Sequence, residues 1–249
     1  MPFRKTKEEV EKVLELFKLG NSNLKIHKIL GFDRSTIRAI LKNPDEYLSL
    51  SMQEHKFNLS LIDKKNYSFL FGIYLGDGCI SKTNKKNLFK LRIFCDNKYP
   101  KIIDEIIKSI NDILPNSNAR IKRHTNDNCS EIYVYSIHLL SLFPQHGSGK
   151  KHERQIILDD WQKEIIDEYP MDFLKGLIYT DGSFYYSDKY ERCNFVNKSI
   201  DIINLCSETM NKLNISNSIR VKNKNSKYLI YSIDIQNQKE LSKIPFRKS

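Results

Sequence analysis

Several features that define other protein classes are absent from this 249-residue chain. It has no run of about 18 apolar residues, which excludes an ordinary membrane-spanning helix, and its opening residues, MPFRKTKEEV, lack the apolar core of a signal peptide. Its five cysteines and six histidines are dispersed, with no C-x-x-C pair and no H-E-x-x-H motif, which excludes the common zinc motifs and a disulfide framework. These absences predict an intracellular protein of the cytoplasm or nucleoid, with an organelle left open and with no membrane partner.

Positive charge is what the chain has in excess, with a formal net charge of +11. The excess is spread over the whole sequence and is not concentrated in a tail. This distribution suits a long polyanion that is contacted along its length, such as double-stranded DNA. The alternative is that the charge serves solubility alone.

The chain contains one sequence pattern twice. The segment LFGIYLGDG (70–78) returns as LKGLIYTDG (174–182), which places a second Asp-Gly pair after a second apolar stretch. Shorter matches follow in the same order in both halves: Asn97-Lys98 with Asn197-Lys198, Arg120-Ile121-Lys122 with Arg220-Val221-Lys222, YSIH (135–138) with YSID (231–234), and LSLFP (140–144) with LSKIP (241–245). The fixed order indicates that residues 66–146 and 170–246 are two copies of one unit.

Each copy predicts the same series of elements. An apolar helix that ends in Asp-Gly is followed by two strands, a helix, two more strands and a short helix. The strands are expected near 79–84, 89–96, 119–124 and 131–136, and in the second copy near 183–187, 192–197, 218–223 and 228–235. The αββαββα order predicts an α+β fold with an antiparallel four-stranded sheet in each copy.

Basic and apolar residues alternate in several of these strands. In FKLRIF (89–94), Lys90 and Arg92 alternate with Leu91 and Ile93, and period-two alternation places the basic groups on one sheet face. Segments 78–95 and 218–230 contain basic residues and no acid, whereas an ordinary solvated face, which is the alternative, would mix the two signs. Including the two asparagines, which would orient water or reach phosphate, the predicted DNA-contacting residues of the two copies are Lys82, Lys90, Arg92, Asn97, Lys98, Arg120, Lys122, Asn197, Lys198, Arg220, Lys222 and Lys224.

Gly72 and Gly176 interrupt the two apolar helices. A glycine inside a helix costs about 0.5–1 kcal/mol relative to alanine, so a gain in packing should offset it. Close packing of helices 68–76 and 172–180 against each other is the expected gain, and it would bring the two helix ends together.

The same packing would bring Asp77 and Asp181 together at the negative ends of two helix dipoles. Two carboxylates in this position repel each other unless cations are present. Mg²⁺ binds through a few carboxylates, water and substrate phosphate, and a metal pair beside phosphate is suited to phosphodiester hydrolysis. The alternative is that Gly78 and Gly182 are left-handed caps and that each aspartate only ends its helix.

The two repeated stretches resemble the LAGLIDADG motifs of homing endonucleases. Against the pattern L-x-G-[IL]-[IY]-x-x-D-G, the matching residues are Leu70, Gly72, Asp77 and Gly78 in the first stretch and Leu174, Gly176, Leu177, Ile178, Asp181 and Gly182 in the second. The first acidic position of the family motif, which is not the catalytic one, is Leu75 in one copy and Tyr179 in the other.

The resemblance covers roughly residues 66–249. It implies a single-chain pseudo-dimer in which two tandem repeats form a pseudo-twofold β-saddle over DNA. It also implies that Asp77 and Asp181 bind the catalytic metal, helped by the carbonyls of Gly76 and Thr180. Mg²⁺ is the expected metal, with Mn²⁺ or Ca²⁺ as substitutes in binding.

The resemblance further implies a lysine near the scissile phosphates, just after the last short helix of a repeat. The corresponding segment is HGSGKKHERQI (146–156), in which Lys150 is the first candidate and Lys151 the second. Either would polarise water or stabilise charge in the transition state. The second copy ends in PFRKS, which makes Arg247 and Lys248 the candidates there. The alternative for 146–156 is a basic linker between the repeats.

The first sixty residues predict a separate small all-α domain. Three helices are expected at 6–20, 24–30 and 34–43, and the last two resemble the helix-turn-helix of resolvase-type DNA-binding domains. The third helix would face the major groove with Arg34, Ser35, Thr36 and Arg38. The alternative is a protein–protein module. The predicted domains are a helix-turn-helix domain at 1–45, a connector at 46–65, the first repeat with a linker at 66–165, and the second repeat at 166–249.

These features predict a monomeric, sequence-specific DNA endonuclease that makes a Mg²⁺-dependent double-strand break by phosphodiester hydrolysis at a long specific site. Two alternatives are a non-cleaving transcriptional regulator, as in WhiA-type proteins that join this scaffold to a helix-turn-helix, and an RNA maturase. Retention of both Asp77 and Asp181 favours the enzyme. An intein is disfavoured because the sequence begins with Met-Pro and has no His-Asn before its C-terminus.

Overall fold

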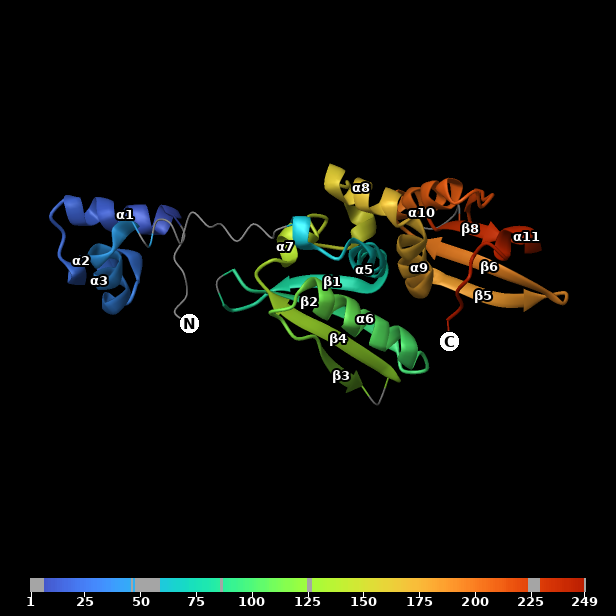
Figure 1. Cartoon of the computed structure of the whole chain (residues 1–249), viewed down its shortest axis with the longest axis horizontal. Coiled ribbons are helices and arrows are strands. Elements are labelled where there is room, and N and C mark those ends of the chain that lie inside the picture. The colour runs from blue at the N-terminus through green and yellow to red at the C-terminus, as the bar shows by residue number, and fades with distance from the viewer. Residues whose placement is uncertain are drawn as a thin grey trace. The chain divides into compact units, whose positions relative to one another are not determined.

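The structure is a computed structural model, and it describes residues 7–45, 47, 59–85, 87–124, 127–223 and 229–248. Lys224 and most of the predicted connector (46–65) lie outside these residues. The chain divides into two compact units, Met1–Lys56 and Phe57–Ser249, each of which is described by itself (Figure 1). In the described part of the chain, no helix combines the length and the apolar character needed to cross a membrane.

The described part of the N-terminal unit includes three short helices, α1 (Lys7–Lys18), α2 (Asn23–Leu30) and α3 (Arg34–Lys42). Ser22 starts α2 by accepting a hydrogen bond from the Lys25 backbone N–H, and Gly31 ends it in the left-handed conformation at φ +67°. The three predicted helices are therefore confirmed. Their shared core consists of Val10, Val13, Ile26, Ile37 and Ile40.

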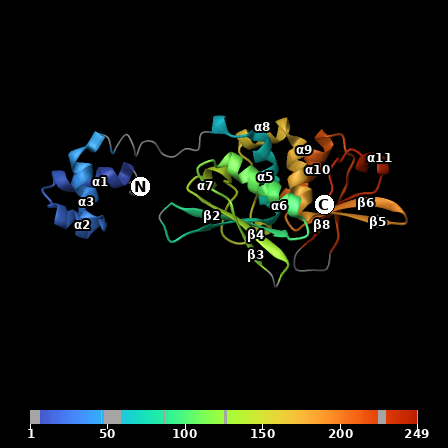
Figure 2. The same ribbon diagram turned by 60° about the horizontal axis from the view of Figure 1, so that its bottom comes forward.

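The C-terminal unit contains two repeats with the same order of elements (Figures 1 and 2). The first comprises α5 (Lys64–Asp77), β1 (Gly78–Lys82), β2 (Phe89–Asp96), α6 (Pro100–Ile113), β3 (Arg120–His124), β4 (Cys129–Ser136) and α7 (Leu139–Leu142). The second comprises α9 (Pro170–Asp181), β5 (Gly182–Ser187), β6 (Tyr190–Asn197), α10 (Ile200–Lys212), β7 (Ile219–Val221), β8 (Tyr231–Ile235) and α11 (Gln238–Leu241). The two antiparallel sheets have the orders β1-β2-β4-β3 and β5-β6-β8-β7, which confirms the αββαββα prediction for both copies.

Three further short helices lie outside the repeated pattern. They are η1 (Leu59–Leu61) before the first repeat, and η2 (Lys151–Glu153) and α8 (Asp160–Glu168) between the repeats. The sequence pattern does not predict α8, because the repeat has no counterpart for it.

The local sequence explains where the principal helices begin. Asp63 caps α5 by accepting a hydrogen bond from the Asn66 backbone N–H at 2.9 Å. Pro100 and Pro170 occupy the first positions of α6 and α9, where a missing N–H carries no cost.

Each sheet packs one of its faces against helices. Leu91 and Ile93 of β2 are buried and pair with the buried Val134 and Ile132 of β4. Burial of a side chain of this size contributes about 1.5–3 kcal/mol to stability. The opposite face of the sheet, which carries Lys90 and Arg92, does not pack against these helices.

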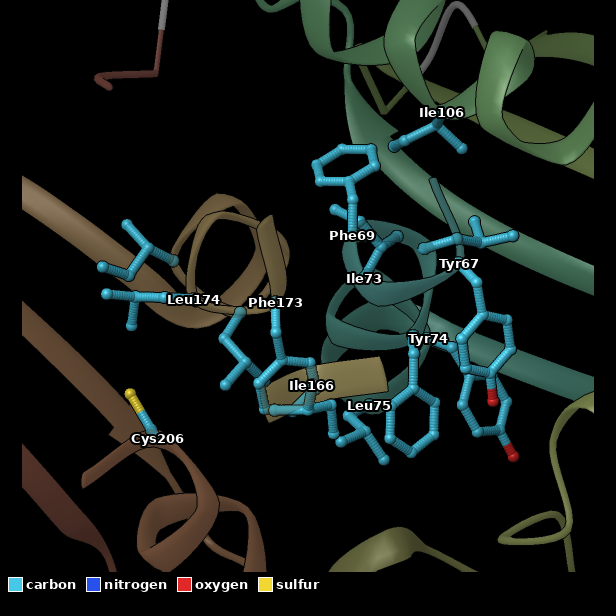
Figure 3. Close-up of a cluster of buried hydrophobic side chains, with 14 of the residues drawn as sticks. Tyr67, Phe69, Ile73, Tyr74, Leu75, Ile106, Ile166, Phe173, Leu174 and Cys206 are labelled. Atoms are coloured by element: carbon cyan, nitrogen blue, oxygen red, sulfur yellow. The ribbon is translucent and has the colours of Figure 1, made fainter. Parts of the chain in front are cut away.

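Helices α5 and α9 lie side by side between the two sheets (Figures 1 and 2). A Cβ on Gly72 would lie 2.5 Å from the carbonyl oxygen of Phe173, and a Cβ on Gly176 would lie 2.2 Å from that of Phe69. Only glycine allows the two backbones to approach this closely, so the predicted packing is confirmed. Figure 3 shows Phe69 and Phe173 among the buried side chains around this contact.

Candidate functional site

Both central helices end in an aspartate, and the two helix ends meet. A Cβ on Gly76 would lie 2.0 Å from Oγ1 of Thr180, so the last turns of α5 and α9 are in contact. Asp77 keeps access to solvent at the edge of this contact, and Asp181 is half-buried. Desolvation by the surrounding protein raises the pKa of both carboxyls, that of Asp181 to about 6, and the negative charge of Asp77 adds to the shift at Asp181. The two acids therefore belong to one electrostatic site.

The glycine after each aspartate is extended. Gly78 has φ −80° and Gly182 has φ −90°, so the alternative of left-handed caps is wrong. A Cβ on Gly78 would lie 2.6 Å from Cα of Tyr74, and a Cβ on Gly182 would lie 2.7 Å from the carbonyl oxygen of Ile178. Each glycine is required because the chain leaves the helix close against its last turn.

The side chain of Lys151 reaches the end of α5. Its Nζ donates hydrogen bonds to the carbonyl oxygens of Gly76 at 3.1 Å, of Gly78 at 2.6 Å and of Tyr74. These carbonyls carry the negative end of the helix dipole, so the ammonium compensates for a carboxylate at this position. Burial lowers the pKa of Lys151 to about 8, although the aspartates at the two helix ends oppose this shift.

Lys248 has the corresponding place at the end of α9. Its Nζ donates a hydrogen bond to the carbonyl oxygen of Thr180 at 3.1 Å, and burial lowers its pKa. Arg247 is directed elsewhere, with Nε 2.8 Å and Nη2 2.7 Å from the carboxylate oxygens of Glu191. Of the two C-terminal candidates, the structure brings Lys248 to the site.

Lys150 and Lys151 are the two candidates in the segment between the repeats. The structure brings Lys151 to the end of α5, whereas Lys150 has its side chain in solvent. Lys150 is exposed, and its backbone N–H donates a hydrogen bond to Oε2 of Glu153 at 3.4 Å. The geometry places the second candidate, Lys151, at the helix end, and the catalytic part of either lysine stays a prediction.

The two asparagines at corresponding sequence positions have different partners. Asn197 Nδ2 donates a hydrogen bond to Oδ2 of Asp181 at 2.8 Å, which opposes the rise in the pKa of that carboxyl. Asn97 Oδ1 instead accepts a hydrogen bond from Oγ of Ser130 at 2.5 Å. Among the described residues, Asp181 is therefore oriented by its asparagine, whereas Asp77 has no corresponding hydrogen bond.

Some of the donor atoms at the helix ends are suited to bind a metal ion. The two carboxylates are the hard oxygen ligands that Mg²⁺ prefers. The carbonyls of Gly76 and Thr180, which were predicted to assist, already accept hydrogen bonds from Lys151 and Lys248. Among the described residues, no three His, Cys, Asp or Glu side chains gather at one point. The site therefore fits a metal held by two carboxylates, with water and phosphate as further ligands, and the part of the two carbonyls stays a prediction.

A pocket of about 570 Å³ opens at the helix ends. Its walls come from both repeats and the segment between them, and they include Tyr74, Cys79, His146, Lys150, Lys151, Arg154, Asp181, Asn197 and Lys198. Lys198 is one of the residues of this wall, and its counterpart Lys98 forms an ion pair with Asp96 at 3.1 Å.

The open face of the first sheet is basic. The register of the strands aligns Cys79, Arg92, Tyr133 and Arg120 in one row. Alternation places Lys90 and Lys122 on the same face, which confirms the predicted basic face for these four lysines and arginines. Lys82 shares the other face with Ile80, at the exposed end of β1.

Two acids, Asp96 at the end of β2 and Glu131 of β4, lie on this basic face. Glu131 of β4 is nearly buried, and Oε1 accepts a hydrogen bond from Lys90 Nζ at 2.6 Å, which lowers the pKa of Glu131. The Lys90 ammonium also lies 4.2 Å from the ring centroid of Tyr133. Since β4 lies outside the acid-free segment 78–95, the composition of one strand does not reveal this pairing.

The open face of the second sheet also carries basic groups. Arg220 pairs with Ser232, and Lys222 is exposed just beyond the end of β7. Arg192 of β6 also lies on this face, which the sequence pattern did not predict. Asp234 adds an acid, which accepts hydrogen bonds from Asn194 Nδ2 and from Ser232 Oγ.

In the N-terminal unit, α3 presents the predicted residues on its outer side. Arg34, Ser35 and Arg38 are exposed and Thr36 is half-buried, whereas Ile37 and Ile40 are buried.

Comparison with known proteins agrees with the duplicated architecture. A family model for the LAGLIDADG-like domain matches residues 168–244, and one for the WhiA LAGLIDADG-like domain matches residues 66–137. No curated protein sequence matches the chain.

Solved structures of the homing endonuclease I-DmoI share the fold. Its mesophilic variants match with a TM-score of 0.52 and 17% identity, over 75% of this chain and 98% of theirs. I-DmoI in complex with DNA and Ca matches with a TM-score of 0.51 and 19% identity, over 72% of this chain and 86% of that one. I-DmoI with DNA and Mn gives 0.51 and 19%, over 72% and 93%. Because the two family matches fall one on each repeat and together cover more than half of the sequence, the chain belongs to the LAGLIDADG family.

Proposed function

We propose that this protein is a sequence-specific DNA endonuclease that makes a Mg²⁺-dependent double-strand break by phosphodiester hydrolysis. The observation that carries the proposal is the meeting of Asp77 and Asp181 at two adjacent helix ends, each with a lysine ammonium on the neighbouring carbonyls. A site with one acid from each repeat and one lysine at each helix end suits a substrate with two antiparallel strands.

The side chains of the site have separate roles in this reaction. Bound Mg²⁺ would polarise the phosphate and lower the pKa of water. Asp77 and Asp181 would hold it, and Asn197 would keep the second carboxylate in place. Lys151, with a pKa of about 8, would hold or release a proton near neutral pH and stabilise negative charge that develops on the phosphate.

The open faces of the two sheets would contact the DNA. Arg92, Arg120 and Arg220 are suited to guanine edges in the major groove, and the lysines to phosphates. The exposed Arg34, Ser35 and Arg38 of α3 would lengthen the recognised sequence. Two repeats in one chain supply both halves of the site, so the proposed active form is a monomer. I-DmoI has been solved with DNA and with Ca or Mn, which supports Mn²⁺ or Ca²⁺ as substitutes in binding.

The test is incubation of the protein with a plasmid library that carries a randomised site, with Mg²⁺ or with EDTA. We expect linear product from a subset of plasmids only with Mg²⁺. Asp77→Asn and Asp181→Asn should each lower the cleavage rate by about 10²–10³-fold while DNA binding persists. Asp160→Asn, in which the side chain removed is 92% exposed and pairs with Lys163, is the matched control and should cleave normally. Cleavage that is undiminished in both site variants would contradict the assignment of the acids.

A non-cleaving DNA-binding regulator is the second candidate function. It is favoured by the match of the WhiA LAGLIDADG-like domain to residues 66–137 and by the separate three-helix unit. The same assay separates the two functions, because a regulator would select a site from the library and release no Mg²⁺-dependent linear product.

A further inference from the structure

The segment 145–157 brings Lys151 to the end of α5, yet it contains little regular structure. It runs from just after α7 to just before α8, and within it only η2 is helical. Ordering a segment of this kind costs about 1–2 kcal/mol of backbone entropy per residue. Side-chain contacts must therefore maintain its shape.

Arg154 supplies the largest set of these contacts. Its Nε and Nη2 donate to the carbonyl oxygen of Gln145 at 3.3 and 3.2 Å, and its Nη1 donates to those of Gly149 at 2.9 Å and Ser148 at 3.4 Å. A Cβ on Gly147 would lie 3.3 Å from Cδ and Nε of Arg154, so the backbone lies directly against this side chain. The planar guanidinium spreads its donors over a rigid fork and so contacts three separate carbonyls with three nitrogens, whereas a lysine would contact them from a single nitrogen.

The two ends of the segment are tied to both repeats. Gln145, which is nearly buried, donates through Nε2 to the carbonyl oxygen of Ile157 at 2.8 Å and so closes the segment on itself. The buried Gln162 joins Gln145 to the hydroxyl of Tyr67 in α5, at 2.7 Å from that hydroxyl. On the other side, the Ile156 N–H donates to Oδ2 of Asp201 in α10 at 2.8 Å.

We propose that Arg154 is a positioning residue: by gathering the carbonyls of Gln145, Ser148 and Gly149, it sets the point from which Lys151 reaches the end of α5. The contribution of this placement to cleavage rests on the proposed nuclease function. A displacement of about 1 Å of a catalytic group costs about 10²-fold in rate, so the effect is expected in kcat and not in DNA affinity.

The experiment compares Arg154→Ala with Arg123→Ala, a matched control on the exposed part of β3. For Arg154→Ala we expect kcat to fall about 100-fold with the DNA dissociation constant changed by no more than about twofold. Millimolar guanidinium should restore part of the rate in Arg154→Ala and none in Lys151→Ala.

Arg154→Lys keeps the charge without the planar fork and should recover only a small part of the lost rate. It also replaces the alanine variant if that one does not fold. A wild-type kcat in Arg154→Ala, or equal guanidinium rescue of Lys151→Ala, would overturn the proposal.

A second measurement does not depend on cleavage. Amide hydrogen exchange across 145–157 and acylation of Lys151 by an amine-reactive reagent should both increase in Arg154→Ala and stay unchanged in Arg123→Ala. If the wild-type protein binds DNA and does not cleave it, the nuclease function fails while this measurement still tests Arg154. Unchanged exchange and labelling in Arg154→Ala would refute the positioning role by themselves.

Discussion

The two repeats are closely alike at their centre and differ at its edge. Both use the same strand order, and both place a glycine of the central helix against a carbonyl of the other helix, at 2.5 Å for a Cβ on Gly72 and 2.2 Å for a Cβ on Gly176. Both helices end in an aspartate followed by an extended glycine. This agreement follows from the contact itself, because a reciprocal backbone approach constrains both partners equally.

Around the helix ends the two halves differ. Lys151 contacts the carbonyls of Tyr74 and Gly76 in α5 and that of Gly78 just after it, whereas Lys248 contacts one carbonyl of α9. Asp181 has an amide donor in Asn197, and within the described part of the chain Asp77 has no corresponding hydrogen bond. The difference teaches that duplication preserves the packing of the two helices but not the surroundings of the two aspartates, so the proposed nuclease should cut the two DNA strands at different rates.

The largest effect is expected where the repeats agree. Gly72→Ala and Gly176→Ala should each lower the free energy of unfolding by about 3 kcal/mol, because each new Cβ meets backbone atoms that cannot move aside. Urea denaturation of the two variants measures this. A large loss in one variant and none in the other would show that the approach is not reciprocal.

The next largest effect is a difference in cleavage rate between variants of Lys151 and of Lys248. Lys151→Met should lower the single-turnover rate by about 10²–10³-fold, and Lys248→Met by about tenfold, because Lys248 makes the fewer contacts. Cleavage of a duplex with a different label on each strand measures the two rates. Lys163→Met, an exposed ion-pair lysine, is the control. Equal losses in the two variants would argue that the half-sites are chemically equivalent.

A smaller effect is expected at the asparagines. Asn197→Ala removes the donor to Asp181 and should slow one strand by about tenfold, the size of a single hydrogen bond to a charged group. Asn97→Ala should have a smaller effect, because its contact is with Ser130. Accumulation of nicked circles in Asn197→Ala alone would support the distinction, and the same accumulation in both would refute it.

The features that the sequence predicted correctly are those fixed by short periodicity or by repetition. Alternation in 89–94 gave the correct faces of β2, and the repeated glycines gave the contact between α5 and α9. A glycine inside an apolar helix destabilises that helix, so a single sequence can indicate that a close packing contact requires it.

The features that escaped prediction depend on how distant segments meet. Lys150 and Lys151 are chemically equal in sequence, and only the shape of the segment around Arg154 decides which one reaches the helix end. Glu131 and Asp234 enter the sheet faces from partner strands, so the register across strands determines which side chains they meet.

The smallest effect concerns the raised pKa of Asp181. Its folded-state pKa of about 6 lies above the usual value of 3.8, so the folded protein retains a proton that the unfolded chain releases. Stability is therefore unaffected below about pH 4, falls as the pH rises from about 4 to 6, and stays lowered above that. The shift corresponds to at most about 3 kcal/mol, and solvent screening of a half-buried carboxylate should reduce this to about 1 kcal/mol.

Urea unfolding in EDTA at pH 4 to 7 should show this fall in the wild type and a smaller one in Asp181→Asn. Asp160→Asn is the control, because Lys163 lowers the pKa of Asp160, so the stability that Asp160 contributes rises with pH instead of falling. Mg²⁺ should reverse the fall only when both aspartates are present, because it binds the charged form that the folded protein otherwise disfavours.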